Sequence, residues 1–157
     1  LPIVPANMEC VLDTKLAESL SSNGYFYILH RFLTDEQILN FIELMNTRKL
    51  VSSISLGVND DSYHLLDKII DRGLKIDIIT IDIAHGHALK MEKMIKHLKE
   101  VTPETFVIAG NISTTEAVLE IESWGADALK VGIGPGSACT TYPSTGFGSR
   151  DCQASTI

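Results

Sequence analysis

Short apolar runs recur along the chain, and they alternate with segments whose apolar residues follow helical spacing. The runs are rich in isoleucine, valine and leucine, a pattern typical of strands that are buried on both faces of a parallel sheet. We therefore predict strands at Ile3-Val4, Tyr25 to Leu29, Val51 to Leu56, Ile76 to Ile83, Phe106 to Ala109 and Ala128 to Val131.

The segments between these runs carry the signals of helix ends. Thr34-Asp35-Glu36-Gln37 is a capping box ahead of an apolar stripe, because the threonine and glutamine side chains can each accept the other residue's backbone N–H. Ser113-Thr114-Thr115-Glu116 is predicted to open another helix in the same way. Gly24, Gly73 and Gly125 are predicted to close three others, since glycine adopts the left-handed conformation of a C-terminal cap.

The alternation of strand and helix predicts right-handed crossovers and a parallel α/β sheet. Two architectures share this pattern, a (β/α)8 TIM barrel and a doubly wound open sheet. A closed barrel typically needs about 250 residues, so the present chain would supply about six of its β/α units. No break in composition divides residues 1–157, which predicts a single domain. Because the chain starts without Met and stops after a glycine-rich loop, we expect it to be part of a longer protein.

Composition excludes disorder and narrows the possible partners. The chain has 13 Lys plus Arg against 20 Asp plus Glu, a formal net charge of −7, and 45% hydrophobic residues. An acidic balance without basic runs argues against nucleic-acid binding and against an anionic membrane surface. No apolar run approaches the roughly 18 residues of a membrane span, and no secretory signal is recognised, so we expect a cytoplasmic protein. Cys10, Cys139 and Cys152 predict neither a disulfide framework nor a zinc site.

The loop after the last predicted strand, from Gly132 to Thr141, contains the largest group of candidate functional residues. Loops in this position carry the reactive groups of α/β folds. The glycines of this loop let backbone N–H groups approach a phosphate, and Ser137 adds a hydroxyl donor. Cys139 is a candidate nucleophile, since oriented N–H dipoles lower the pKa of a thiol. Thr141 is a candidate hydrogen-bond donor to a leaving group or water. A flexible turn with an inert cysteine is the competing interpretation.

Three other predicted strand ends carry polar candidates. Asp82 ends an apolar strand and can bind a ribose or a cofactor amide, or can cap the next helix. His85 and His87 lie two residues apart, but two histidines without a third ligand are weak support for a metal site. Asn111 is a candidate base contact or a turn residue. His30-Arg31 is a candidate contact to a phosphate or an acidic partner, or a solvated pair.

Taken together, these motifs resemble those of the IMP dehydrogenase and GMP reductase family. Leu129 to Thr141 is similar to the family's active-site loop signature. Pro5-Ala6-Asn7-Met8, Ile81 to His87 and Ala109-Gly110-Asn111 resemble further family motifs in the same order. The resemblance covers essentially the whole chain, and it implies the (β/α)8 TIM barrel rather than the open sheet.

Within the family, the sequence favours the GMP reductase branch. Gly24 to Phe32 and Thr145-Gly146-Phe147-Gly148 resemble that branch, especially its bacterial members. IMP dehydrogenases usually carry a regulatory CBS-type insert after the second barrel strand, whereas here one predicted helix leads directly to the strand at Val51. Two alternatives stay open: NAD-dependent oxidation of IMP to XMP, and a purine-nucleotide-binding or assembly fragment without turnover.

The resemblance implies NADPH-dependent reductive deamination of GMP to IMP and ammonia, through a covalent adduct of Cys139 at purine C2. By similarity, Thr141 helps the ammonia to leave, together with a glutamate from beyond the residues present here. A homotetramer is also implied. Because the later barrel strands and phosphate loops of the family are missing, we expect the 157-residue chain alone to be inactive.

The resemblance also assigns contacts to individual residues. Those implied for the substrate are Met8, Asn111, Gly134, Gly136 and Ser137. Those implied for the cofactor are Asp82, Ala84 and His85. The backbone carbonyls of Gly134, Gly136 and Cys139 match positions that bind a monovalent cation such as potassium in the dehydrogenase branch.

Overall fold

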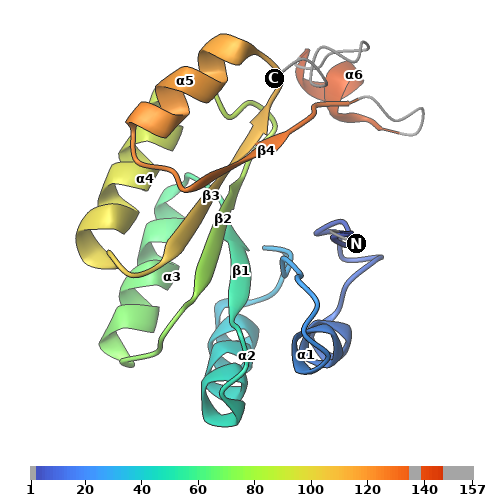
Figure 1. The fold of residues 1–157 in the computed structure, drawn as a ribbon, viewed down its shortest axis with the longest axis vertical. Coiled ribbons are helices and arrows are strands. Elements are labelled where there is room, and N and C mark those ends of the chain that lie inside the picture. Colours follow the sequence, from blue (N-terminus) through green and yellow to red (C-terminus); the bar gives the residue numbers. More distant parts are fainter. Residues whose placement is uncertain (1–2, 135–138, 147–157) are drawn as a thin grey trace. The chain divides into compact units, whose positions relative to one another are not determined.

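The computed structural model of the chain describes residues 3–134 and 139–146, and its fold is α/β (Figure 1). Within those residues four strands form one parallel sheet in the order β1-β2-β3-β4, which is also their order along the chain. The strands are β1 (Ser53–Leu56), β2 (Ile78–Asp82), β3 (Phe106–Ile112) and β4 (Ala128–Val131). The helices are α1 (Thr14–Ser22), α2 (Asp35–Arg48), α3 (Asp60–Asp71), α4 (Leu89–Val101), α5 (Thr115–Ser123) and α6 (Thr141–Thr145).

The sequential strand order is the arrangement of a TIM barrel, whereas a doubly wound sheet reverses its order at a switch point. Closure of a barrel, and the assignment of residues 1–157 to a single domain, stay predictions. The chain divides into two compact units, one up to Thr80 and one from Ile81, so that the division falls inside β2. No helix of the described residues is long and apolar enough to cross a membrane.

Two predicted strands are not formed among the described residues. Ile3 and Val4 lie outside any strand and are exposed. The run from Tyr25 to Leu29 contributes only an isolated parallel bridge, between Leu29 and Ile54 of β1.

The side chain of Tyr27 gives a physical reason for the short bridge. Its hydroxyl donates to the carbonyl of Val51 at 2.8 Å and accepts the N–H of Ser53 at 3.2 Å. The Tyr27 hydroxyl therefore occupies the Val51 carbonyl and the Ser53 N–H, which a longer strand pair would use for backbone hydrogen bonds. Tyr27 is buried, and burial raises the pKa of its hydroxyl to about 12, so it remains a neutral donor.

The predicted helix boundaries are largely confirmed. At α2, Thr34 Oγ1 accepts the N–H of Gln37 at 3.3 Å, and the Gln37 side chain accepts the N–H of Thr34 at 2.9 Å. At α5 the cap is Thr114, one residue later than the predicted box, and it accepts the N–H of Ala117. The three predicted closing glycines follow α1, α3 and α5 with positive φ; they are Gly24, Gly73 and Gly125.

In the second unit, α4 and α5 cover one face of β3 and β4 (Figure 1). Val107 and Ala109 alternate along β3 and are fully buried on that side, because side chains of a strand point alternately to its two faces. The helices contribute the rest of this core: Met91, Met94, Ile95 and Leu98 from α4, and Ala117 and Ile121 from α5.

The register of β3 and β4 is interrupted at Asn111. Gly110 pairs with Lys130, but the next pair is Ile112 with Val131, so Asn111 is an extra residue on β3. Such a bulge turns the local backbone and redirects a side chain. The peptide bond between Gly110 and Asn111 is cis. The end of β3 is thus shaped locally around the residue that the sequence marks as a candidate base contact.

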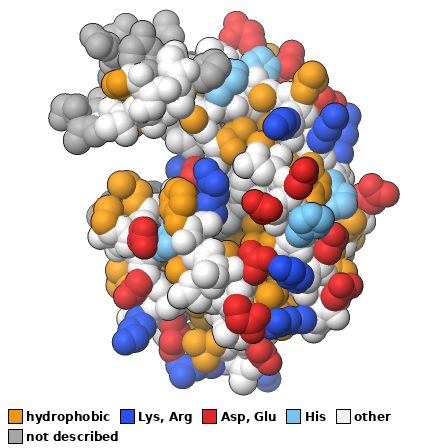
Figure 2. Space-filling view, turned by 180° about the vertical axis from the view of Figure 1, so that it is seen from behind, with side chains coloured by type: hydrophobic (Ala, Val, Ile, Leu, Met, Phe, Trp, Pro, Cys, Tyr) orange, Lys and Arg blue, Asp and Glu red, His pale blue; other side chains and the backbone are white. Residues whose placement is uncertain are grey.

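Charged side chains of both signs are mixed on one face of the molecule. On the face shown in Figure 2, Lys and Arg side chains lie among Asp and Glu side chains. Two ion pairs of the first unit join charged side chains of α2 to those of α3 and its C-cap residue. Lys68 contacts Asp35 at 2.7 Å, and Arg72 contacts Glu36 at 3.0 Å. Both pairs are substantially exposed, and pairs of this kind typically contribute less than about 1 kcal/mol.

Candidate active site

The carboxyl ends of β2, β3 and β4 are tied together in the second unit. The N–H of Ile83 donates to Gly110 O at 3.0 Å, and the N–H of Asn111 donates to Ile83 O at 2.9 Å. The N–H of Gly86 then donates to Asn111 O at 2.8 Å. A Cβ atom on Gly86 would lie 2.9 Å from that same oxygen, so glycine permits the close approach. The loop after β2 is therefore held against the end of β3.

Asn111 connects this arrangement to the loop that carries the predicted nucleophile. Its Nδ2 donates to the carbonyl of Gly132 at 3.0 Å, and the N–H of Gly132 donates to Ile112 O at 2.7 Å. The Asn111 Oδ1 atom is buried and has no hydrogen-bond partner in the described part of the chain. The interpretation of Asn111 as an ordinary turn residue is wrong, since it belongs to β3 and bridges two strand ends.

Asp82 lies at the mouth of the sheet, as its position after an apolar run predicts. It is the last residue of β2, and its Oδ1 forms an ion pair with Nζ of Lys130 on β4 at 3.0 Å. The alternative interpretation, that Asp82 caps the following helix, is wrong because the N-cap of α4 is Ala88. Lys130 is a site residue that the motifs alone do not reveal, although a lysine in the otherwise apolar run Ala128 to Val131 is a usable signal.

The two histidines after β2 have different surroundings. His87 Nε2 lies 2.7 Å from Glu120 Oε2 on α5, and its ring centre lies 6.1 Å from that of Trp124. His85 and Ala84 are half-buried in the same loop. Within residues 3–134 and 139–146, no group of three or more His, Cys, Asp or Glu residues is placed to hold a metal ion. The contact of His87 with Glu120 therefore connects the loop after β2 to α5.

Cys139 and Thr141 lie together beyond β4. The Cys139 Sγ atom is 3.4 Å from Thr141 Oγ1, and Cys139 is exposed. Hydrogen bonding with the Thr141 side chain, followed by that with its backbone, lowers the pKa of the Cys139 thiol. Both bonds favour the thiolate, which is the nucleophilic form of cysteine. Thr141 is also the first residue of α6.

The remaining predicted loop residues are only partly described. Gly134 is half-buried and has a positive φ of 69°, a conformation that favours glycine. Gly136 and Ser137 lie outside the described residues, as does Cys152. The predicted phosphate contacts and all three predicted cation-binding carbonyls therefore stay predictions.

In the first unit, the predicted contacts Met8, His30 and Arg31 have distinct environments. Met8 is half exposed, whereas His30 is buried and accepts the N–H of Phe32 on Nδ1 at 3.2 Å. The interpretation as a solvated pair is therefore wrong for His30, whereas Arg31 is exposed. The Arg31 guanidinium lies 5.1 Å from the ring centre of Phe32, and its Nη1 atom lies 3.5 Å from the position of a Cβ on Gly57.

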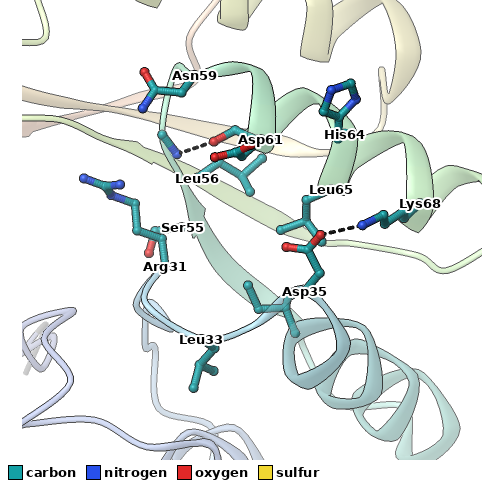
Figure 3. Close-up of a pocket in the computed structure, with 13 residues that line it drawn as sticks. Arg31, Leu33, Asp35, Ser55, Leu56, Asn59, Asp61, His64, Leu65 and Lys68 are labelled. Atoms are coloured by element: carbon teal, nitrogen blue, oxygen red, sulfur yellow. Dashed lines mark hydrogen bonds and ion pairs between the residues drawn. The ribbon is translucent and has the colours of Figure 1, made fainter.

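A polar cavity of about 480 Å³ opens at the carboxyl end of β1 (Figure 3). Arg31 and Asn59 stand on one side of it, and the Lys68–Asp35 ion pair on the other. The Gly57 N–H donates to Ser62 Oγ at 3.1 Å in its wall. Sequence reasoning missed the polar residues that α3 contributes to this cavity, because single polar residues on a solvated helix face give no signal. They are Asp61, Ser62, His64 and Lys68.

Comparison with known proteins agrees with these motifs. The family model of the IMP dehydrogenase / GMP reductase domain matches residues 1–157, and the chain belongs to this family. It is 52% identical to a GMP reductase of Bacillus subtilis (strain 168), and 53% identical to one of Oenococcus oeni. It is 50% identical to a GMP reductase of Enterococcus faecalis. Each comparison covers 100% of this chain and 48% of the relative, so the chain spans about half the length of these proteins.

Proposed function

We propose that this chain carries the nucleophile of a GMP reductase, which converts GMP to IMP and ammonia with NADPH as reductant. The observation that carries the proposal is the Cys139–Thr141 pair, an exposed thiol whose pKa is lowered by a hydroxyl 3.4 Å away. It follows a parallel strand at the edge of the sheet where α/β folds concentrate their chemistry. The identity of about half of all positions to proteins named GMP reductase supports the same activity.

The proposed reaction begins at Cys139. Its thiolate adds to purine C2 of GMP, a C–S bond forms, and the C2–N bond breaks as ammonia leaves. Hydride addition at C2 then breaks the C–S bond and releases IMP and the thiolate. The sum is GMP, NADPH and two protons in, with IMP, NADP⁺ and ammonium out. Thr141 is proposed to stabilise the thiolate and to donate a hydrogen bond toward the departing nitrogen.

Substrate positioning is proposed for residues of the motifs that resemble those of the family. Asn111 fits a role toward the purine, because its buried Oδ1 lacks a partner among the described residues and accepts a donor readily. Met8 is proposed to contact the purine through its half-exposed side chain. Gly134, Gly136 and Ser137 are proposed to hold the phosphate with backbone N–H and hydroxyl groups.

Cofactor binding is proposed at Asp82, Ala84 and His85. The residues present fit a dinucleotide, because the Lys130 contact uses only one oxygen of the partly exposed Asp82 carboxylate, and the other suits a ribose hydroxyl. When bound, NADPH would supply the hydride. The loop after β2 would hold it through backbone fixed by the Gly86 and Asn111 hydrogen bond.

Several features of the whole protein belong to the same proposal. We propose a single TIM-barrel catalytic domain without a CBS-type insert, assembled as a cytoplasmic homotetramer. A monovalent cation, potassium, is proposed on the carbonyls of Gly134, Gly136 and Cys139. Because the relatives are about twice as long, we further propose that residues 1–157 alone do not turn over GMP.

The test is a spectrophotometric assay of the full-length gene product. GMP-dependent loss of NADPH absorbance, matched by ammonia release, is the expected result, and Cys139→Ser should abolish both. Cys10→Ser is the matched control, since Cys10 is also an exposed cysteine. Oxidation of IMP with NAD, without GMP-dependent NADPH loss, would overturn the proposal. Absence of both activities with retained nucleotide binding would replace it with a binding role.

A further inference from the structure

The Lys130 side chain crosses β3 to reach the carboxylate of Asp82, a residue proposed to bind the cofactor. Lys130 on β4 and Asp82 on β2 form an ion pair of 3.0 Å, although β3 lies between their strands. The residue of β3 at the crossing is Gly110, which pairs with Lys130 in the register. A Cβ atom on Gly110 would lie 2.6 Å from Cβ of Lys130 and 2.8 Å from its carbonyl oxygen. Because Gly110 has no side chain, the Lys130 side chain has room to pass over β3 and reach Asp82.

The surroundings of the pair limit the freedom of the carboxylate. The Lys130 side chain is 33% exposed and that of Asp82 is 24% exposed. Charges interact more strongly in such partial burial than in open water, and a charge-assisted hydrogen bond also fixes the direction of its acceptor. Lys130 occupies Asp82 Oδ1, so the orientation of the second oxygen is defined as well.

A second lysine–aspartate pair in the same unit shows what a purely structural pair looks like. Lys99 Nζ lies 2.5 Å from Asp127 Oδ2 and also donates to Thr105 O at 3.2 Å. The same Asp127 oxygen accepts the N–H of Val107 at 2.7 Å. This pair ties backbone at the amino-terminal ends of β3 and β4, where barrel residues serve stability. The Lys130–Asp82 pair lies at the carboxyl-terminal ends, where barrel residues serve chemistry.

We propose that Lys130 is a positioning residue: it orients the Asp82 carboxylate so that its second oxygen accepts a ribose hydroxyl of the nicotinamide cofactor. This inference rests on the proposed function, because it takes the cofactor as the ligand of Asp82. In this proposal Lys130 acts through its ion pair with Asp82. Lys130 lies two residues before Gly132. The strand β4 therefore carries the residue that orients the Asp82 carboxylate and also leads into the loop with Cys139.

The test compares variants of the full-length gene product. Lys130→Met should raise KM for NADPH about tenfold, the loss of one charge-assisted contact, while KM for GMP and the alkylation rate of Cys139 stay the same. Lys130→Arg should restore most of the affinity, because it keeps the positive charge. Asp82→Asn should have an effect similar to that of Lys130→Met. The double variant should be no more than about twofold worse than Asp82→Asn alone.

Lys99→Met is the matched control, since it removes the other lysine–aspartate pair of the unit. It should lower the melting temperature and leave KM for NADPH unchanged. The inference is overturned if Lys130→Met lowers only the melting temperature. It is also overturned if the increases in KM for NADPH caused by Lys130→Met and Asp82→Asn multiply in the double variant. If Lys130→Met does not fold, the same comparison with Lys130→Gln decides it.

A binding measurement separates this inference from the proposed function. NADPH is titrated by its fluorescence without GMP, and Lys130→Met should weaken the dissociation constant by the same factor of about ten. If the protein binds NADPH with this dependence but does not turn over GMP, the reaction assignment fails and the positioning role stands. If the unsubstituted protein does not bind NADPH, the positioning role is overturned.

Discussion

Gly110 and Lys130 are register partners on β3 and β4, and a Cβ atom on Gly110 would stand 2.6 Å from that of Lys130. Observed Cβ contacts essentially never come that close, so one of the two strands would have to shift. The glycine at this point is therefore a requirement of packing between strands, and the ion pair of Lys130 with Asp82 depends on it.

Gly110→Ala should destabilise the protein by about 1–3 kcal/mol, the cost of overpacking a site that cannot relax. Urea unfolding followed by circular dichroism measures this. Gly57→Ala is the matched control. The nearest atoms to its added Cβ would be side-chain atoms, Ser62 Oγ at 3.3 Å and Arg31 Nη1 at 3.5 Å, which can move. Equal losses in the two variants would contradict the packing argument.

Thr141→Val should raise the pH at which Cys139 reacts with iodoacetamide. The Thr141 hydrogen bonds hold the pKa of the Cys139 thiol below its usual value of 9.0, so removing the hydroxyl moves that pKa upward. The measurement is the alkylation rate against pH, with each cysteine followed separately by peptide mass spectrometry. Cys10 in the same digest is the internal control. An unchanged midpoint for Cys139 would exclude the Thr141 hydroxyl as its activating group, because the variant keeps the backbone hydrogen bond of residue 141.

Asp77 should contribute stability that is lost in acid. Burial raises the pKa of this carboxyl, but hydrogen bonds from Lys75 and from Ser52 outweigh it and leave the pKa below its ordinary 3.8. The contribution is thus complete above 3.8 and disappears as the pH falls through the lower folded-state value. Asp77→Asn should flatten this part of the curve of melting temperature against pH.

The control for the acid prediction is Asp67→Asn, an exposed aspartate on α3. It should leave the dependence on pH unchanged. If Asp77→Asn and the unsubstituted protein lose stability in parallel below about pH 4, the hydrogen bonds that Lys75 and Ser52 donate to Asp77 do not stabilise the folded state.

Thr34→Ala should cost about 1 kcal/mol of unfolding free energy, because it removes the side chain that accepts the Gln37 N–H at the start of α2. Thr34→Ser keeps the hydroxyl and should retain most of the stability. Both are measured by urea unfolding under the same conditions. A serine variant as unstable as the alanine variant would show that packing of the threonine methyl group, and not the cap, is responsible.

Local patterns in the sequence predicted much of the fold. The capping box at Thr34 and the closing glycines were found in advance, because they depend on residues a few positions apart. The strands at β1, β2, β3 and β4 were also predicted, since apolar runs report burial directly. The run from Tyr25 to Leu29 was overpredicted as a strand. Hydrophobicity does not reveal that the Tyr27 hydroxyl takes the place of a backbone partner.

The candidate site divides in the same way. The sequence by itself determined the chemical groups: a cysteine with a nearby threonine after β4, an aspartate at the mouth of β2, and an asparagine at the end of β3. Their residue types and their places after apolar runs are properties of short segments. The tertiary structure alone decided that Asn111 is a bulge residue bonded to Gly132, and that Lys130 pairs with Asp82, 48 positions away. Contacts between residues so far apart in the sequence depend on strand order and register. These determine which side chains lie within a few ångströms of one another, and the periodicity of a single segment does not encode them.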